Sequence, residues 1–468
     1  MSLGVGVQFL TCGKGDPVVA EFGRHKITLA EFRIAYLNLL KEPNTFDSPR
    51  LREEFLDELI RRRLLAEEAR RLGLDRDERL RLRTEAFRDR CAREAHYARV
   101  IRPRVRTDER SLREIYQYFR ERRRLKHLFA ETRAQADSLY AALQRGVPFD
   151  SLARVVFRDS ILSRNGGDLG WVTWDQLDYD LAMTAFRLPL NVYSPPVPSQ
   201  FGYHILMVTG YERVPIVTET EYQMRRPRIK ALAEYKIGDK LAAEYIRNLM
   251  ARKKIQVNPQ LLQFVGSKLT PLVRRQPSTL EFLQGKGLDE EEIGQAALSL
   301  WDVRHETLAT VDGEPMTVAW FVNSLAYVPR DALNRSYKTA LDFALRDFAI
   351  TQEAKKMGLD RSLEVRRKVR LYEDYVLKVM MTRKLVREVS VSEAEMRDYY
   401  ERRRADLFRS VPFDSVRTLI RDRLLDEKRR RLLPEHLQQL AQGMAIRKHP
   451  EILHRYYERL YREKEGVP

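Results

Sequence analysis

Two stretches of sequence decide the fold in the middle of this chain: Gly166-Gly167-Asp168-Leu169-Gly170-Trp171-Val172 and Gly202-Tyr203-His204-Ile205-Leu206-Met207-Val208. In the first stretch, the paired glycines supply backbone angles that other residues rarely adopt, so the chain turns there before it extends. The second stretch is a short apolar run that begins at a glycine, which is typical of a strand. The two stretches therefore predict two strands, the first entered through a tight turn.

The sequence on either side of these strands predicts a small domain with both strands and helices. Gly146 follows an amphipathic run and is expected to end a helix. The expected strands cover 125–129, 166–172, 192–197 and 202–208, and the expected helices cover 133–145, 149–156 and 180–186. Four short strands with helices on one side make an α+β domain that is small enough to fold as a unit.

The rest of the chain contains an internal repeat. Residues 68–76 read EARRLGLDR, and residues 353–361, 285 positions later, read EAKKMGLDR. Gly73 and Gly358 are expected at the C-terminal ends of helices, where a glycine readily adopts left-handed angles. A short strand is expected ahead of each copy, at 18–22 and 308–311. The repeat predicts two related helical modules.

A second element is repeated behind each module. Residues 222–262 and 413–453 align without a gap at a shift of 191. Residues 124–215 separate this element from the front helices in the first copy, whereas 404–411 close the same gap in the second. The predicted parts are a tail at 1–17, a first helical module at 18–123, an inserted domain at 124–215, a C-terminal helix that completes the first copy at 216–264, a linker region at 265–305, a second helical module at 306–410, and a C-terminal helix that completes the second copy at 411–468.

Composition excludes several classes of protein. The 468 residues include 85 Lys and Arg against 67 Asp and Glu, a net charge of +18, and 43% hydrophobic residues are enough for folded cores. Arginines alternate with glutamates along the predicted helices, which is typical of solvated helix faces and not of a nucleic-acid-binding stripe. Two cysteines exclude a disulfide scaffold and a four-thiolate zinc site. No run of 18 apolar residues occurs, so no membrane-spanning helix is expected. We expect no cofactor, no metal and no nucleic-acid partner.

The first residues allow two interpretations. Residues 2–11 are apolar, and Cys12 begins the polar run Cys-Gly-Lys-Gly-Asp-Pro. This pattern resembles the lipidation site of bacterial lipoproteins, although no basic region precedes it and Thr11 stands where a smaller residue is usual. Cys12 is either a lipidated residue that tethers the chain to a membrane or an incidental thiol in a disordered tail. Cys91 lies within an Arg-rich helical stretch and is expected to be a packed residue.

The inserted domain resembles the parvulin-type peptidyl-prolyl cis-trans isomerases. The markers of that family occur in order: a first strand with His127, Gly-x-x-Phe at 146–149, the glycine turn at 166–171, and Phe-Gly-Tyr-His-Ile at 201–205. The flanking helices resemble those of SurA-like and PrsA-like periplasmic chaperones. The resemblance implies an α+β, predominantly helical chain, in which duplicated SurA-like modules carry one parvulin domain with a four-stranded antiparallel sheet plus helices.

The resemblance also implies which residues form the site. The expected catalytic set combines two imidazoles beneath the cleft with a polar group and a hydroxyl: His127, His204, Asp159 and Ser199. Ser160, one register step away, is the alternative to Asp159. The expected substrate-binding set is apolar and surrounds the proline ring: Leu169, Leu177, Leu181, Phe186 and Phe201. Leu181 departs from the family, whose members carry a phenylalanine there.

Two functions of different class follow from the resemblance. The first is isomerisation of X-Pro bonds, for which an apolar slot that strips water from the amide suffices without a nucleophile or a metal. The second is an ATP-independent holdase chaperone whose inactive parvulin domain only binds peptides, and a structural envelope protein is a third interpretation. The implied partners are unfolded or nascent polypeptides with X-Pro bonds, outer-membrane protein precursors among them, and a second copy in a homodimer. The implied location is the periplasm or cell envelope, with the tether at Cys12.

Overall fold

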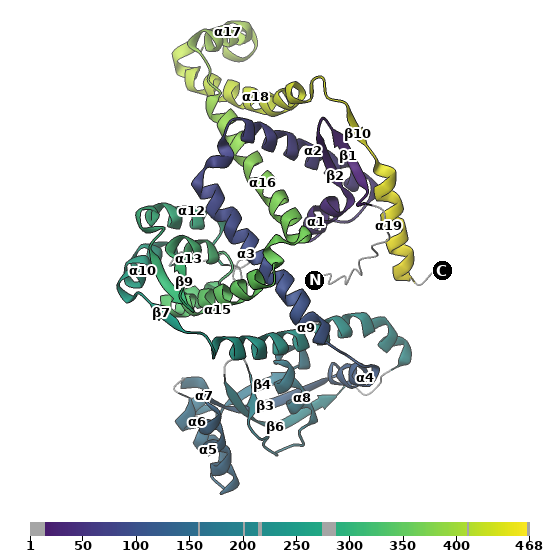
Figure 1. The fold of residues 1–468 in the computed structure, drawn as a ribbon, viewed down its shortest axis with the longest axis vertical. Coiled ribbons are helices and arrows are strands. Elements are labelled where there is room, and N and C mark those ends of the chain that lie inside the picture. Colours follow the sequence, from purple (N-terminus) through teal and green to yellow (C-terminus); the bar gives the residue numbers. More distant parts are fainter. Residues whose placement is uncertain are drawn as a thin grey trace.

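The protein consists of a helical body and a smaller sheet-containing domain. The computed structural model describes residues 15–157, 160–199, 202–213, 218–273, 287–409 and 411–465. The sheet-containing domain lies at one end of the molecule, beyond a long helix that separates it from most of the body (Figure 1). The predicted class, predominantly helical with one α+β domain, is confirmed. None of the helices in the described ranges combines the length and the apolar character that crossing a bilayer requires.

The inserted domain is built on a four-stranded antiparallel sheet, as predicted. The strand order is 4-3-6-5, and the two central strands pair over their whole length. The strand expected at 192–197 is shorter than predicted, because its prolines lack the N–H groups that a ladder needs. The elements are β3 (Glu121–Ala130), α5 (Arg133–Gln144), α6 (Phe149–Val156), α7 (Ser160–Arg164), β4 (Asp168–Val172), η3 (Trp174–Gln176), α8 (Tyr179–Arg187), β5 (Val197–Pro198) and β6 (Tyr203–Arg213).

The body on the N-terminal side of the chain is mostly helical and surrounds the inserted domain in sequence. Helix α9 is the longest element and runs along the inserted domain (Figure 1). The elements are β1 (Val18–Phe22), β2 (His25–Thr28), α1 (Leu29–Leu39), α2 (Pro49–Arg71), η1 (Leu74–Arg76), α3 (Glu78–Val100), η2 (Arg102–Arg104), α4 (Glu109–Tyr118), α9 (Glu219–Met250), β7 (Ile255–Val257) and α10 (Pro259–Val273).

The C-terminal side of the chain repeats this order of elements without an inserted sheet. Here α17 is followed directly by a single π-helical turn and a second long helix. The elements are α12 (Glu290–Ser299), η4 (Trp301–Val303), β8 (Thr307–Val311), β9 (Glu314–Thr317), α13 (Val318–Ser324), α14 (Arg330–Arg335), α15 (Tyr337–Lys356), η5 (Leu359–Arg361), α16 (Leu363–Glu388), α17 (Glu393–Arg403), η6 (Arg404–Phe408), α18 (Phe413–Ala441), β10 (Ile446–Lys448) and α19 (Pro450–Glu465).

Each small sheet of the body combines strands from distant parts of the chain. The hairpin β1–β2 pairs with β10, and the hairpin β8–β9 pairs with β7. Leu453 and Tyr457 of α19 are buried in the core around β1 and β2, while Leu261 and Val265 of α10 are buried around β8 and β9. The stretches 216–264 and 411–468 were expected to complete their own copies. Their long helices α9 and α18 do pack on α4 and α17 of the same copy, whereas the strand and the helix that follow each of them pack on the other copy's hairpin.

The stretch 265–305 is not a plain linker where the structure describes it. Helix α10 extends into it and α12 lies within it, and Leu269, Ile293 and Leu300 are buried in the core around β8 and β9. Glycines and prolines suggested a linker, but the apolar spacing at 293, 296 and 300 is that of an amphipathic helix. The core therefore extends through both ends of this stretch.

The glycines of the repeat end their helices as predicted. Gly73 and Gly358 have φ values of 75° and 70°, the left-handed region that favours glycine. The N–H of Gly73 donates to the carbonyl of Arg70, and the N–H of Gly358 donates to that of Lys355, both at 2.9 Å. The two turns direct α3 and α16 away from the helices that precede them.

Buried charges join the two copies at the centre of the body. Asp374 of α16 accepts hydrogen bonds from Arg63 Nε at 2.5 Å and from Arg70 at 2.8 Å, both on α2. The side chains of Arg63 and Asp374 are only 3% and 2% exposed. Such a pair is costly to break, because removal of Asp374 leaves the buried charge of Arg63 with only the longer ion pair to Glu31, at 3.5 Å.

We expect Asp374→Asn to lower the free energy of unfolding by about 3–5 kcal/mol, because Arg63 keeps its charge in a buried site. Urea titration followed by circular dichroism measures the shift in midpoint. Asp398→Asn, which removes an exposed pair with Arg402, is the matched control and should cost less than about 1 kcal/mol. Equal shifts for the two variants would contradict this assignment.

Candidate active site of the inserted domain

The central strands of the inserted sheet place two histidines side by side. In the β3–β6 register, His127 lies opposite Leu206 and Phe129 lies opposite His204, so the two histidines are diagonal neighbours on one face. Their Nδ1 atoms are 3.3 Å apart, and their rings are inclined by only 16°. The sequence prediction that these imidazoles form a pair is in accord with this geometry.

Ser199 continues the row of polar atoms from the histidine pair. Its hydroxyl oxygen lies 3.1 Å from Nε2 of His204, and the hydroxyl donates to the carbonyl of Gly202 at 3.3 Å. This arrangement makes Ser199 the acceptor for an Nε2–H of His204, so Nδ1 of His204 accepts from Nδ1–H of His127. Nε2 of His127 is buried without a hydrogen-bond partner in the described ranges, and a bare nitrogen there avoids an unsatisfied N–H.

Aromatic rings and burial keep this pair uncharged. Phe157 lies 4.8 Å from the ring of His127, and Phe129 lies 5.3 Å from that of His204, measured between ring centroids. Burial, with a smaller contribution from charge on His204, lowers the pKa of His127 to about 4. Burial also lowers the pKa of His204, partly offset by the negative charge of Asp178. Both imidazoles are therefore neutral at pH 7 and serve as hydrogen-bonding groups.

The paired glycines of the turn allow β4 to approach the first histidine. Gly167 has a φ of 77°, and its carbonyl accepts the backbone N–H of His127 at 2.9 Å. A Cβ at this position would lie 2.3 Å from the carbonyl oxygen of His127, so only glycine fits. The turn therefore fixes the strand on which the pair is built.

The predicted apolar residues lie in different environments. Leu177 is partly buried and lines a cavity beside Ser199. Leu181 and Phe186 of α8 are 8% and 2% exposed and pack with Trp174 in the domain core. Leu169, in β4, is 41% exposed. Of these four, Leu177 lies where a ligand in the cavity would contact it, whereas Leu181 and Phe186 support the wall from behind.

Three predicted positions lie outside the described residues: Asp159, Phe201 and Cys12. Ser160, the alternative to Asp159, is the first residue of α7. Cys91 is buried, as expected, and burial raises the pKa of its thiol to about 12. In the part of the chain that is described, no three His, Cys, Asp or Glu side chains are grouped so that they could hold a metal ion.

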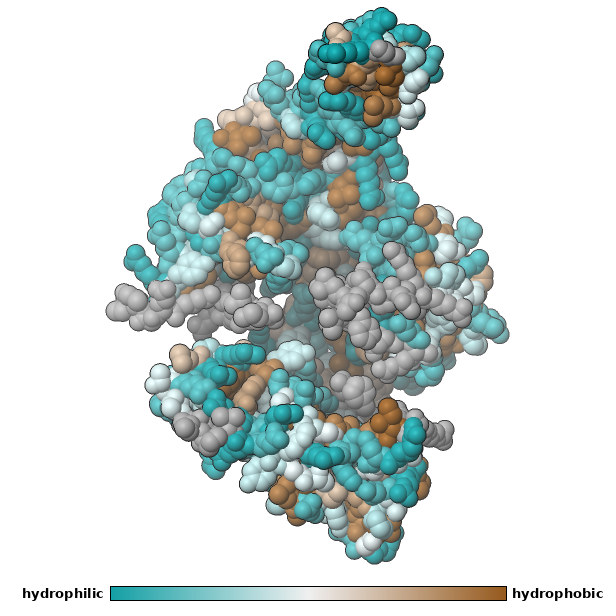
Figure 2. Space-filling model, turned by 180° about the vertical axis from the view of Figure 1, so that it is seen from behind, coloured by the Kyte–Doolittle hydropathy of each residue, from teal (hydrophilic) through white to brown (hydrophobic). Residues whose placement is uncertain are grey.

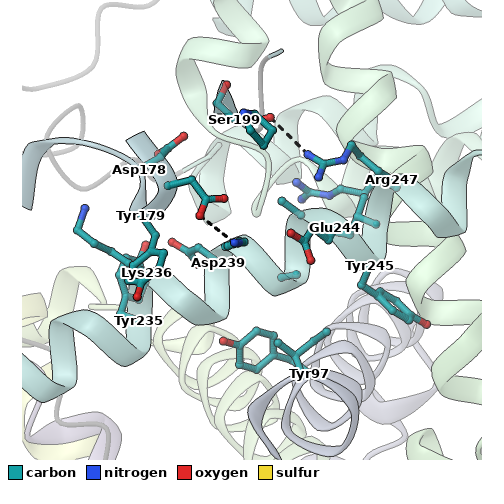
Figure 3. A pocket seen from close by; sticks show the side chains of 18 of the residues that line it. Tyr97, Asp178, Tyr179, Ser199, Tyr235, Lys236, Asp239, Glu244, Tyr245 and Arg247 are labelled. Carbon is teal, nitrogen blue, oxygen red and sulfur yellow. Dashed lines mark hydrogen bonds and ion pairs between the residues drawn. The ribbon is translucent and has the colours of Figure 1, made fainter. Parts of the chain in front are cut away.

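A cavity of about 810 Å³ lies between the inserted domain and the body. Residues 175–180 and 198–199 of the inserted domain form one wall, α9 forms the floor, and α3 and α15 contribute the far side. Seen from behind, a deep recess separates the inserted domain from the body (Figure 2). In Figure 3, Ser199 and Asp178 face side chains of α9 across this space. The histidine–serine row therefore ends at a cavity that both parts of the molecule enclose.

Helix α9 is tied to the cavity wall by three cationic side chains. Lys236 donates to the carbonyl of Leu177, Arg247 donates to the carbonyl of Ser199 at 3.4 Å, and Lys240 pairs with Asp180 at 2.8 Å. The contact between Arg247 and Ser199 is drawn in Figure 3. These contacts hold the loops that carry Leu177 and Ser199 against the body.

Sequence reasoning missed the residues of the body that line the cavity. On α9 they recur at helical spacing, with Lys236, Asp239, Lys240, Ala243 and Arg247 on one stripe. That stripe is visible in the sequence, but nothing local indicates that it faces the inserted domain. Tyr97 and His96 of α3 line the cavity too, although they precede α9 by more than a hundred residues along the chain.

Comparison with known proteins identifies the class of the inserted domain. Residues 102–212 match the family model described as the PPIC-type PPIASE domain. The inserted domain, with its four-stranded sheet and its histidine pair, is thus a parvulin-type peptidyl-prolyl isomerase domain.

The relatives of the chain include foldases and parvulin-like isomerases. The foldase protein PrsA of Bacillus subtilis is 28% identical over 162 residues, which are 34% of this chain and 53% of the relative. The PrsA of Geobacillus kaustophilus is 26% identical over 144 residues, 30% of this chain and 51% of the relative. A parvulin-like PPIase of Rickettsia conorii is 24% identical over 222 residues, 46% of this chain and 74% of the relative. The chain spans about half the length of the two PrsA proteins.

Solved structures similar to this chain include a PrsA isomerase and a SurA-like chaperone. PrsA from Bacillus anthracis is 21% identical over 34% of this chain and 68% of its own, with a TM-score of 0.22. One of two proteins from Campylobacter jejuni, described as SurA-like chaperones, is 17% identical over 50% of this chain and 96% of its own, with a TM-score of 0.21.

The buried histidine pair predicts a specific dependence of stability on pH. His127 has a folded-state pKa of about 4 against about 6.5 when unfolded, so protons bind the unfolded chain first as pH falls. The contribution of His127 to stability should be complete above about pH 7 and should be lost as pH drops from about 6.5 to about 4. His127→Gln should flatten this dependence. Thermal midpoints across that range measure it, and identical profiles for both proteins would refute the assignment.

Proposed function

We propose that the chain is a parvulin-type peptidyl-prolyl cis-trans isomerase joined to an ATP-independent chaperone body that assists the folding of secreted or outer-membrane proteins. The row of His127, His204 and Ser199 at the edge of a cavity carries this proposal, because it combines the family's paired imidazoles and hydroxyl with space for a polypeptide. The match of residues 102–212 to the PPIC-type family supports the isomerase part.

The chemistry that we propose is desolvation and positioning. An X-Pro amide resists rotation by about 18–20 kcal/mol because resonance keeps it planar. A proline held against Leu177 loses water from the amide and favours the twisted, less polar state. Asp159 is the proposed polar group at the imide, with Ser160 as the alternative. Ser199 and the two neutral histidines orient the site and do not transfer protons.

The chaperone part rests on the size and surface of the body. Apolar side chains are exposed at the tip formed by α17, η6 and α18, where Leu407, Val411 and Leu419 are 52%, 40% and 63% exposed. This tip is the brown region at the top of Figure 2. Such a surface suits apolar segments of unfolded clients. These clients are the proposed partners, and a homodimer through the helical arms remains part of the proposal.

The proposed location is the periplasm or cell envelope, with a lipid tether at Cys12. One of the two Campylobacter jejuni chaperones is described as a periplasmic protein, which supports the location. The tether rests on the sequence pattern around Cys12 alone. Palmitate labelling that is lost in Cys12→Ser tests it, and an unlabelled wild-type protein made in a bacterial envelope would contradict it.

We expect the full chain to accelerate the refolding of a protein whose slow phase is limited by proline isomerisation. Leu177→Ala should reduce kcat/KM about tenfold, because it removes apolar contact with the proline ring. Ser199→Ala should have a smaller effect of about threefold, through loss of the acceptor for His204. Asp137→Asn, on the exposed face of α5, is the matched control and should behave as wild type.

The same experiment decides between the two functions. Acceleration that falls in Leu177→Ala supports the isomerase. No acceleration by the wild type, combined with suppression of client aggregation by wild type and Leu177→Ala alike, would reject catalysis and leave the holdase, in which the parvulin domain only binds peptides.

A further inference from the structure

The charges that line the cavity are unequally paired. Each lysine and arginine on its wall has an oxygen partner: Lys236, Arg247 and Lys240 bind the inserted domain, as described above, and Arg93 and Arg346 pair with Asp347 at 3.4 and 2.7 Å. The cations are therefore engaged in holding the walls together. They are not available to an acidic ligand without loss of those contacts.

In the described ranges, several carboxylates on the same wall have no lysine or arginine within ion-pair distance. Asp178, Asp239 and Glu244 form no ion pair with any residue that the structure describes. Figure 3 shows all three around the space below Ser199. Burial and the charge of Asp178 raise the pKa of Asp239, although a hydrogen bond from Tyr235 and the charge of Lys236 oppose this. The unpaired charge of the cavity is thus negative, with Asp239 exposed to the open space and Asp178 and Glu244 half-buried.

The cavity is continuous with the proline site. Leu177 and Ser199, which belong to that site, also line the cavity together with α9. A proline held against Leu177 therefore directs its neighbouring residues towards α9. Aromatic side chains from three helices offer these neighbours apolar contact, namely Tyr97, Tyr179, Tyr235 and Tyr245.

We propose that this cavity is the part of the substrate site that holds the residues flanking the proline, and that it selects polypeptides with a lysine or arginine beside the proline. The proposal rests on the proposed isomerase function and names its substrate class. A cationic side chain in the cavity compensates Asp178, Asp239 and Glu244, whereas an acidic one meets their repulsion. Helix α9 supplies two of these three carboxylates, so the helical body completes the site of the parvulin domain.

The test uses the full-length chain and peptides of one length that carry Lys, Ala or Glu on either side of a single proline. Exchange NMR gives kcat/KM, and fluorescence anisotropy of labelled peptides gives affinity. We expect the Lys peptide to exceed the Glu peptide about tenfold in both, and the ratio to shrink as salt rises from about 50 mM to about 500 mM. Asp239→Asn combined with Glu244→Gln should bring the ratio close to one, while Asp137→Asn should keep it.

Each outcome is decisive. Equal turnover and equal binding of the three peptides by the wild type would overturn the charge selection while the isomerase function stands. A Lys-to-Glu ratio that survives the double substitution would also overturn it. Binding that favours Lys without any turnover would reject the isomerase function and support the cavity as the binding site for basic segments.

A different set of contacts carries a second inference, about how the body is assembled. Phe87 of α3 and Tyr372 of α16 stack with ring centroids 4.2 Å apart and planes inclined by 9°. They are 285 positions apart, the shift that relates the two copies of the sequence repeat. Contact between equivalent positions occurs where a two-fold axis passes through an interface.

Ion pairs on either side of this contact are equivalent as well. Asp374 pairs with Arg70 of the first copy at 2.8 Å, and Asp89 pairs with Lys355 of the second copy at 2.8 Å. The two acids are 285 positions apart, and so are the two bases. The exchange of β7 and β10 between the hairpins follows the same reciprocal pattern.

We infer that the body is a two-fold pseudo-dimer within one chain, whose two copies fold only by exchanging parts. Each half then carries an interface whose partner is the other half. A protease site inserted within residues 274–286 of the folded chain tests this. After cleavage the two fragments should elute together and unfold together. Fragments that separate in native buffer and keep their helical circular dichroism would show that each copy folds alone.

Discussion

Helix α9 is the element on which the arrangement of the whole molecule depends. Its first half buries Tyr222, Ile229 and Ala233 in the core of the parvulin domain, and its second half lines the cavity and leads into β7. The parvulin domain is therefore held by apolar burial at one end of the helix and by the cations of α9 at the other. Because β7 then enters the sheet of the second hairpin, the orientation of the proline site is coupled to the core of the opposite copy.

Each copy contains an equivalent pair of packed helices, and a different part of the chain packs on each pair. In the first copy α4 and α9 pack together beneath Trp174 and Phe186 of the parvulin domain. In the second copy α17 and α18 pack around Phe408 from the single turn η6. The residues that pack between the two helices correspond at a shift of 284 in the first helix and 191 in the second: Leu112, Ile115, Tyr116, Tyr222 and Ile229 in one copy, and Met396, Tyr399, Tyr400, the partly buried Phe413 and Ile420 in the other. The apolar helix pair thus packs against the parvulin domain in the first copy and forms the exposed tip with η6 in the second copy.

Local signals in the sequence were sufficient for the elements and for the histidine pair. Strand β1 and helix α6 have the predicted bounds. His127 and His204 lie side by side because the register of β3 and β6 makes them diagonal neighbours on one face of the sheet. The exchange of β7 and β10 could not be predicted, because a repeat shows which segments are equivalent and not which copy each packs against. Leu181 was expected at the pocket, and it lies on α8 among the core residues against which Leu177 packs, so its contact with a proline ring stays a prediction. The cavity residues of α9 and α3 were missed because only tertiary packing brings them to the proline site.

The central claim is that the proline site of the parvulin domain faces the body across a shared cavity. Photo-crosslinking with an X-Pro peptide that carries a benzophenone group next to the proline tests this most directly, with adducts mapped by mass spectrometry on the full-length chain. The account predicts adducts on residues 235–247 of α9 and on Tyr97 of α3. Adducts confined to α5 and α6, on the opposite face of the sheet, would contradict it.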